Sequence, residues 1–327
     1  IKNQISSNNN SMFAIQRKVF GGSQIGAFIV NRETSGNYDF LEANDKYNRV
    51  VGLDYNLASS NNRWIGKFYT HKSFKPNDKE GNLSSFASIL YNTREWRLYS
   101  NTVFVDEDFR SDLGFIRRTG IIKTGNSITR NFYPKKGKIN SHGFRFLHLS
   151  WLQQNLNYFK TDESFNFEYT LSTNNQNQLQ LGFNNKFVFL FNSFDPSRTD
   201  GALELPSETD YNYNEWNLNY RLNFANPLIF NSELTYGGFF NGSKLSYTGT
   251  IGYRFQPKFI FTLQWDYNKI KLPRPYSSND IILIRPKFDF TFTKNIFWST
   301  LIQYSNLTNN LGINSRLQWR FAPLSDL

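Results

Sequence analysis

The sequence predicts an all-β protein: a transmembrane, antiparallel, up-and-down β-barrel of about 16 strands, in a range of about 14–18. Three observations predict it. Apolar and polar residues alternate along almost the whole chain, as in strands with one apolar and one wet face. Aromatic residues make up 18% of the 327 residues, yet the mean hydropathy is negative, because polar residues fill the alternate positions. No apolar run reaches the ~18 residues of a transmembrane helix, whereas barrel strands cross with ~9–11.

The segment Phe259–Asn268 shows the alternation most clearly. One face of the expected strand carries only aromatic and aliphatic side chains: Phe259, Phe261, Leu263, Trp265 and Tyr267. The other face carries mostly polar ones: Ile260, Thr262, Gln264, Asp266 and Asn268. Aromatic side chains facing lipid and polar side chains facing a lumen are typical of outer-membrane barrels.

The remaining elements follow in chain order. Ile1–Ser11 is rich in Asn and Ser and is interpreted as a linker or loop. The expected strands before the central loop are Met12–Val19, Gln24–Arg32, Arg49–Ala58, Arg63–Lys72, Ser84–Asn92, Glu95–Asp106, Gly120–Phe132, Gly143–Tyr158, Ser164–Ser172 and Gln178–Phe191. Ser193–Asp210 is a long Pro/Ser/Asp-containing loop. The strands expected after it are Tyr211–Phe224, Leu228–Phe240, Leu245–Phe255, Phe259–Lys271, Ile281–Thr293, Ile296–Ser305 and Leu311–Phe321.

The connections between the last strands alternate in length. Ala225–Pro227, Gln256–Pro257 and Lys294–Asn295 are short, whereas Leu272–Asp280 is longer. Short turns at one rim and long loops at the other are typical of outer-membrane barrels. A soluble sandwich or propeller is the competing interpretation, but soluble strands are usually shorter and a propeller would show a fixed repeat period.

We expect residues 1–327 to form a single outer-membrane barrel domain that is a fragment of a longer chain. No signal peptide precedes Ile1, and the last strand is expected to be cut off or supplied by residues beyond Leu327.

Composition removes several classes of function. The chain has no cysteine, so disulfides, thiolate metal sites and cysteine nucleophiles are excluded. The net charge is +11, from 37 basic and 26 acidic residues, but the basic residues are scattered, so no nucleic-acid partner is expected. The three histidines, His71, His142 and His148, lack the spacing of a metal motif. We therefore expect no metal and no cofactor.

Four segments carry a resemblance to a known family: Gln16–Gly26 with Val30–Arg32, Asn48–Leu57, Asp108–Arg118, and Leu317–Leu327. With these segments the chain resembles the C-terminal β-barrel domain, of unassigned function, that Bacteroidota outer-membrane proteins carry behind a family-9-like carbohydrate-binding domain. The resemblance implies the outer membrane of a Gram-negative bacterium and a further strand after the last segment. It implies no activity, and no glycan site is carried over, because the sugar-binding-like domain is not in this sequence.

The densest charge cluster lies between Asp106 and Arg118, around Gly114. Interleaved acids and arginines there have two interpretations: a pore constriction or polar-ligand site, or an inward-folded loop held by Arg–carboxylate pairs. The second is favoured, because such pairs need no ligand. The candidate lumen or constriction residues are Asp106, Asp108, Arg110, Asp112, Arg117 and Arg118.

Five more arginines occupy polar-face positions of the expected strands: Arg145, Arg221, Arg254, Arg316 and Arg320. They either line a lumen that favours anions or neutralise lumen carboxylates, for which the candidates are Glu168, Glu215, Glu233 and Asp266. The two interpretations have equal weight.

Two His-x-Ser pairs, His71 with Ser73 and His148 with Ser150, place histidine and serine on one strand face. This spacing resembles the dyad of outer-membrane phospholipases. No supporting Asn or calcium-site pattern accompanies either pair, so we expect no catalytic residues.

The predicted function is a non-enzymatic integral outer-membrane barrel. It is either an accessory subunit of a larger outer-membrane assembly or a pore or binding component for polar solutes. Its expected partners are outer-membrane lipids and lipopolysaccharide, together with other outer-membrane or periplasmic proteins if it is a subunit. The alternatives are an outer-membrane lipid hydrolase using a His-x-Ser dyad and a soluble glycan-binding β-module.

Overall fold

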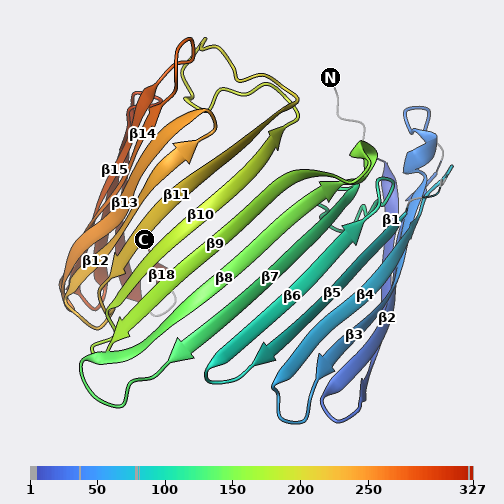
Figure 1. Ribbon diagram of the computed structural model, residues 1–327, viewed down its shortest axis with the longest axis horizontal. Helices are drawn as coiled ribbons and strands as arrows, with labels where there is room; N and C mark the ends of the chain where they lie inside the picture. The colour runs from blue at the N-terminus through green and yellow to red at the C-terminus, as the bar shows by residue number, and fades with distance from the viewer. Residues whose placement is uncertain (1–5, 37, 78–79, 81, 323–324, 327) are drawn as a thin grey trace. The chain divides into compact units, whose positions relative to one another are not determined.

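The computed structural model describes residues 6–36, 38–77, 80, 82–322 and 325–326. Its described residues form one antiparallel meander of 17 strands (Figure 1). The strands are β1 (Ser7–Val19), β2 (Ser23–Ser35), β3 (Tyr47–Ala58), β4 (Trp64–Phe74), β5 (Leu83–Asn92), β6 (Trp96–Val105), β7 (Ile121–Phe132), β8 (Ile139–Gln153), β9 (Phe159–Thr173), β10 (Gln178–Leu190), β11 (Thr209–Arg221), β12 (Leu228–Phe239), β13 (Gly242–Phe255), β14 (Phe259–Lys271), β15 (Asn279–Thr293), β16 (Ile296–Ser305) and β17 (Asn310–Ala322). A two-residue strand, β18 (Ser325–Asp326), pairs with the end of β17.

The all-β meander and the strand number agree with the sequence prediction, but two expectations differ from the structure. The described strands do not close the sheet into a barrel, so β1 and β17 are its edges. The linker predicted at the start of the chain is wrong from Ser7 onward, because that residue already pairs with Ser35 in the register of β1 and β2. Backbone hydrogen bonds form the ladder, so the Asn- and Ser-rich composition does not prevent strand formation. Residues 1–5 of that linker lie outside the described part.

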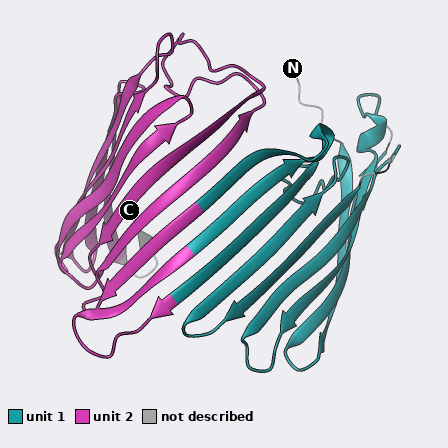
Figure 2. Cartoon of the chain, viewed as in Figure 1, with its two compact units in different colours: residues 1–130, 146–165 teal, residues 131–145, 166–327 magenta. Residues whose placement is uncertain are grey.

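The chain divides into two compact units, coloured separately in Figure 2. Unit 1 contains residues 1–130 and 146–165, and unit 2 contains residues 131–145 and 166–327.

One face of unit 2 is apolar, as the alternation predicts. Trp216 lies opposite Tyr236 across β11 and β12, and the next pair on the same face is Leu218 with Leu234. The same face continues at Ile251 of β13, which lies opposite Leu263 of β14. The apolar face expected for Phe259–Asn268 is therefore continuous with its neighbours. Some of its large side chains are exposed, such as Trp216 at 65%, whereas those of β14 are partly buried.

The other face of unit 2 is polar. Glu233 lies opposite Asn219 on one side and Thr248 on the other, and Thr248 in turn lies opposite Asp266. Lys186 forms an ion pair with Glu215 at 2.5 Å. The central strands of this unit thus separate apolar from polar side chains across their two faces.

The predicted alternation of short and long connections holds in part: residues 222–227 after β11 form a longer connection than residues 240–241 after β12. The longest connections all follow even-numbered strands: residues 36–46, 75–82, 106–120, 191–208 and 272–278. Turns after odd-numbered strands include the two-residue connection at 294–295. Because successive strands run in opposite directions, all connections of one parity emerge at the same end of the strands. No helix among the described residues is long and apolar enough to cross a membrane.

Candidate functional site

The connection between β6 and β7, residues 106–120, packs onto one face of unit 1. Phe109 of this loop is 7% exposed and forms a buried cluster with Val50 of β3, Val105 of β6 and Ile121 of β7. Ile116 packs against the same cluster. Burial of a phenylalanine side chain contributes about 1.5–3 kcal/mol. The loop is therefore held to the sheet by apolar contacts at its start and middle.

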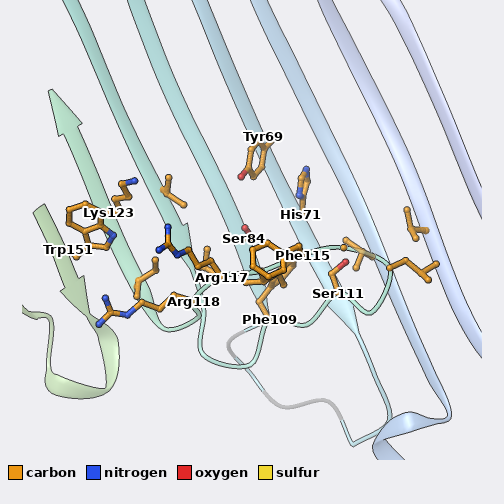
Figure 3. Close-up of a pocket in the computed structure, with 18 of the residues that line it drawn as sticks. Tyr69, His71, Ser84, Phe109, Ser111, Phe115, Arg117, Arg118, Lys123 and Trp151 are labelled. Carbon is orange, nitrogen blue, oxygen red and sulfur yellow. The ribbon is translucent and has the colours of Figure 1, made fainter. Parts of the chain in front are cut away.

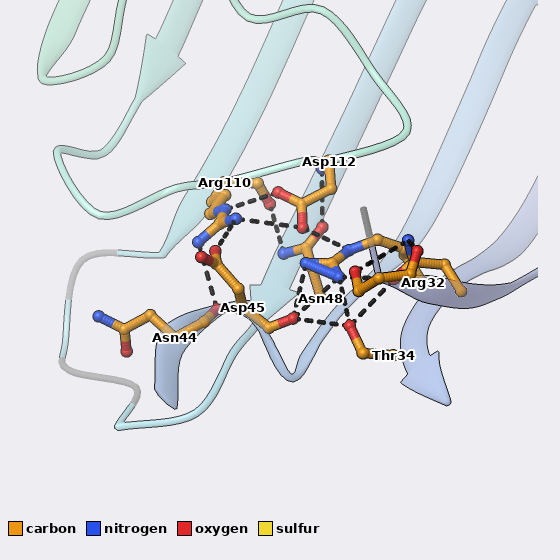
Figure 4. Close-up of polar contacts among 9 residues, drawn as sticks. Arg32, Thr34, Asn44, Asp45, Asn48, Arg110 and Asp112 are labelled. Atoms are coloured by element: carbon orange, nitrogen blue, oxygen red, sulfur yellow. Dashed lines mark hydrogen bonds and ion pairs between the residues drawn. The ribbon is translucent and has the colours of Figure 1, made fainter. Parts of the chain in front are cut away.

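A charged network holds the same loop at a second place (Figure 4). The carboxylate of Asp112 accepts hydrogen bonds from Arg32 Nε at 2.8 Å and from Arg110 Nε at 2.5 Å. Arg110 also donates from Nη2 to Asp45 Oδ1 at 2.7 Å. We call Arg32, Asp45, Arg110 and Asp112 the arginine–aspartate network. It joins the 106–120 loop to β2 and to the connection that precedes β3.

Asn48 fixes the backbone of the loop beside this network. Its Nδ2 donates to the carbonyl of Arg110 at 3.1 Å, and its Oδ1 accepts from the backbone N–H of Asp112 at 2.9 Å. Asn48 is 3% exposed. A buried amide that satisfies both a backbone donor and a backbone acceptor defines one loop conformation.

The network also affects the titration of Arg110. Burial acts to lower the pKa of Arg110, but the hydrogen bonds and negative charges of Asp45 and Asp112 outweigh it and raise the pKa above its ordinary value. Arg110 is therefore charged at neutral pH.

Two further predicted site residues also hold the loop. Asp106 is 7% exposed, and its Oδ2 accepts a hydrogen bond from the backbone N–H of Leu83 at 3.0 Å. Asp108 forms an ion pair with Lys75 at 3.6 Å, and its backbone carbonyl accepts from the same ammonium at 3.1 Å. These contacts connect the 106–120 loop to the start of β5 and to the connection that precedes it.

Arg117 and Arg118 lie elsewhere, on the wall of a cavity in unit 1. Arg118 Nη1 pairs with Asp162 Oδ2 of β9 at 3.2 Å. Arg117 is exposed. The six predicted site residues therefore divide into four that hold the loop and two that face the cavity. That they line or constrict a lumen stays a prediction.

The cavity measures about 760 Å³ and lies between the 106–120 loop and the strands beneath it (Figure 3). Its walls are mainly aromatic and aliphatic. The aromatic side chains are Phe28, Tyr69, His71, Phe109, Phe115 and Trp151. This volume falls in the range of small-molecule sites, about 300–1,000 Å³, in which apolar walls surround a few polar groups.

Two groups of side chains give the cavity its chemistry. On β4 the rings of Tyr69 and His71 stack at 4.2 Å, and Phe28 of β2 meets His71 edge-on at 4.9 Å. At the other end, Lys123 Nζ of β7 lies 4.7 Å from the ring centre of Trp151 on β8. One end is therefore a stack of rings, and the other presents cations beside an indole.

Sequence reasoning missed these cavity residues. It selected the charged residues of the loop, whereas the walls come from β2, β4 and β8, which only the sheet register brings together. One signal existed in the sequence. Gly52 occurs within a regular strand, and a Cβ there would lie 2.4 Å from the Phe28 ring and 2.5 Å from the His71 ring. A glycine inside a strand marks a close approach of neighbouring groups.

The two His-x-Ser pairs have other contacts. Ser73 is fully buried, and its Oγ accepts a hydrogen bond from the backbone N–H of Arg110 at 3.2 Å. His148 Nε2 lies 3.2 Å from Glu163 Oε1. Among the described residues, neither histidine has a hydrogen bond to the serine two positions later. The expectation of no catalytic residues stays a prediction.

The strand arginines differ in their partners. Arg145 pairs with Glu168 at 2.7 Å, as the charge-neutralising interpretation predicts for that residue. Arg221 instead donates to Gln178 at 2.6 Å, and Arg254 donates to the carbonyl of Phe224. Neutralisation of a carboxylate thus accounts for Arg145, whereas Arg221 and Arg254 have the other partners named above.

In the described part of the chain, no group of three or more histidine and carboxylate side chains is placed to hold a metal ion. No protein-family model matches the chain, and no curated protein matches it.

Proposed function

We propose that this chain forms the membrane-embedded barrel of a non-enzymatic outer-membrane protein in a Gram-negative bacterium and acts there as a solute-binding or pore component. The observation that supports it is an inverted burial pattern. Among the described residues, the buried apolar side chains are only Val50, Val105, Phe109, Ile121, Leu205, Ile270 and Leu272. Large apolar side chains are exposed on strands of both units instead, including Phe13, Leu53 and Leu98 in unit 1 and Trp216, Tyr253 and Leu317 in unit 2.

Water is a poor solvent for such a surface. Soluble monomers rarely expose contiguous apolar patches larger than a few hundred Å². In a bilayer the same side chains face hydrocarbon, and the backbone polar groups are satisfied by the strand ladder. The alternative of a soluble glycan-binding module leaves the apolar face without an explanation.

The barrel requires one step beyond the open sheet. In an antiparallel meander β1 and β17 run in the same direction, so they cannot pair antiparallel with each other. Bacterial barrels contain an even number of strands. We propose that β18, which pairs with the end of β17, marks the eighteenth strand of a barrel that is closed in the membrane. The resemblance to the Bacteroidota barrel domain, which stays a proposal, implies a closed barrel as well.

The solute-binding role is favoured by the cavity in unit 1, which lies on the face away from the proposed lipid surface. The contacts that anchor the 106–120 loop do not require a pocket of this size. A role as an accessory subunit is the second candidate. It applies if the sheet stays open, since exposed strand edges are templates for pairing with another chain.

Heat-modifiability tests the barrel. The full-length protein, extracted in detergent, is run on SDS gels with and without boiling. We expect the unboiled protein to migrate faster and the membrane fraction to resist carbonate extraction. A protein that is soluble without detergent and shows no shift would refute the membrane assignment. Native gels then identify partners, and conductance in planar bilayers separates a pore from a silent subunit.

A further inference from the structure

We propose that the unit 1 cavity binds a small aromatic carboxylate, with the aromatic body among the rings of β2 and β4 and the carboxylate at Arg117 and Lys123. This inference deepens the proposed solute-binding role and rests on it. It commits to a ligand class that the walls and the charges of the cavity select together.

The loop leaves part of the apolar surface of the cavity uncovered. Phe115 is 89% exposed and Leu113 is 47% exposed, although both line the cavity. The loop is anchored by the Phe109 cluster and by the arginine–aspartate network, so these two side chains do not project from an unattached segment. An apolar ligand body in the cavity would cover surface that nothing in the described chain covers.

The shape of the cavity wall on β2 and β4 favours a planar ligand. The stacked rings of Tyr69 and His71 and the edge-on ring of Phe28 present flat and edge surfaces at van der Waals spacing. Planar aromatic molecules make offset-stacked and edge-to-face contacts with such groups. Gly52 is needed for this arrangement, because any larger residue would intrude between the rings of Phe28 and His71. The strand sequence therefore preserves a ring-lined wall.

The charge of the cavity wall favours an anionic ligand. The ionised side chains of the cavity wall are Arg117, Arg118 and Lys123 on the positive side and Asp162 on the negative side. Asp162 is taken by Arg118. Among the described residues, Arg117 and Lys123 have no carboxylate within ion-pair distance. Figure 3 shows both near Trp151, at one end of the group of lining residues.

An anion at that end would form charge-assisted hydrogen bonds with both cations. A cationic ligand would meet net positive charge, and a neutral sugar would leave the cations unpaired. The combination of ring walls and unpaired cations therefore selects an aromatic anion, and a carboxylate matches the planar fork of arginine.

The experiment titrates the folded protein in detergent with 2-naphthoate by isothermal calorimetry, with 2-naphthamide as the uncharged probe of equal shape. Titration into detergent alone is subtracted. We expect saturable binding of naphthoate and binding of naphthamide that is weaker by roughly tenfold or more, because only the carboxylate makes charged hydrogen bonds.

Two pairs of variants locate the site. The double variant R117Q/K123Q should weaken naphthoate by roughly tenfold and leave naphthamide unchanged. Its matched control is K135Q/K136Q, which removes two exposed charges from the turn between β7 and β8. Phe115→Ala should weaken both probes, whereas Phe20→Ala should weaken neither, although Phe20 is 88% exposed and thus as accessible as Phe115.

The heat shift distinguishes a failure of the ligand inference from a failure of the proposed barrel. If the protein shows the shift but does not bind naphthoate saturably, or if R117Q/K123Q binds it as the wild type does, the ligand inference is overturned and the barrel stands. If the shift is absent, the proposed barrel fails, whatever binds.

Discussion

Substitution of Asp112 by alanine should release the 106–120 loop while leaving the sheet intact. The carboxylate of Asp112 accepts from Arg32 and from Arg110, and its side chain is 13% exposed. Arg32 is equally covered, at 13%. Removal of the carboxylate therefore leaves a largely buried guanidinium without its charged partner.

The magnitude follows from the contacts that remain. Loss of one partner from a buried ion pair costs about 3–5 kcal/mol. Arg32 keeps hydrogen bonds to the carbonyl of Asp45 at 2.8 and 2.9 Å, which reduces this cost. Arg110 is 36% exposed and keeps its bond to Asp45, so solvent screens its loss. We expect a net loss of about 2 kcal/mol, which corresponds to a roughly thirtyfold rise in the open population of the loop.

Limited trypsin digestion measures that population, because the backbone of Arg110 is held by Ser73 and Asn48 and becomes cleavable when the loop opens. Asp112→Ala should be cut there about thirtyfold faster than the wild type, whereas Asp112→Asn should give an intermediate rate. Glu33→Gln is the control, because the ion pair of Glu33 with Arg49 is largely exposed and contributes at most about 1 kcal/mol. Equal cleavage of Asp112→Ala and the control would refute the anchoring role of the network.

Two further predictions concern other parts of the chain. Gly52→Ala should destabilise unit 1 by about 1–3 kcal/mol, because the alanine Cβ meets the rings of Phe28 and His71. The temperature at which the gel shift is lost measures this destabilisation, and an unchanged temperature would contradict it. In the loop after β10, burial raises the pKa of Asp195, but hydrogen bonds from the Ser197 hydroxyl and from backbone N–H groups outweigh it, so the pKa lies below its ordinary value of 3.8. The stabilisation of the loop by the Asp195 carboxylate is therefore present above pH 3.8 and is lost as the pH falls through the lower folded-state pKa. Hydrogen exchange at the Ser197 amide, corrected for intrinsic rate, should accelerate in the wild type over that fall in pH. Asp195→Asn should lose this pH dependence.

Most strands could be predicted from the sequence and the cavity could not, because alternation is a local pattern whereas the cavity is formed by residues far apart in the chain. Alternation is local, so a segment such as Phe259–Lys271 was predicted with the bounds that β14 has. The charge cluster at Asp106–Arg118 was also visible as composition. Its partners Asp45 and Arg32 were not, because they lie more than 60 residues away and meet the loop only after the sheet has formed.

A paired substitution on β12 tests whether the apolar face meets lipid. Leu234 lies near the middle of the strand, between Leu218 and Tyr247, and is 37% exposed. The next residue, Thr235, points to the polar face between Asn217 and Ser246. In a bilayer, Leu234→Arg places a charge near the midplane and should cost about 2–4 kcal/mol. Thr235→Arg should cost little, because its face is wet and carries carboxylates.

If the apolar face meets water instead, both variants should have the stability of the wild type. The reason is that an arginine on a partly exposed surface is tolerated within about 0.5 kcal/mol. The measurement is the urea midpoint of the gel shift for protein folded into lipid vesicles. A large loss for Leu234→Arg with a small one for Thr235→Arg supports lipid contact. Equal midpoints for the two variants would mean that the exposed apolar side chains of this sheet are covered by something other than a membrane.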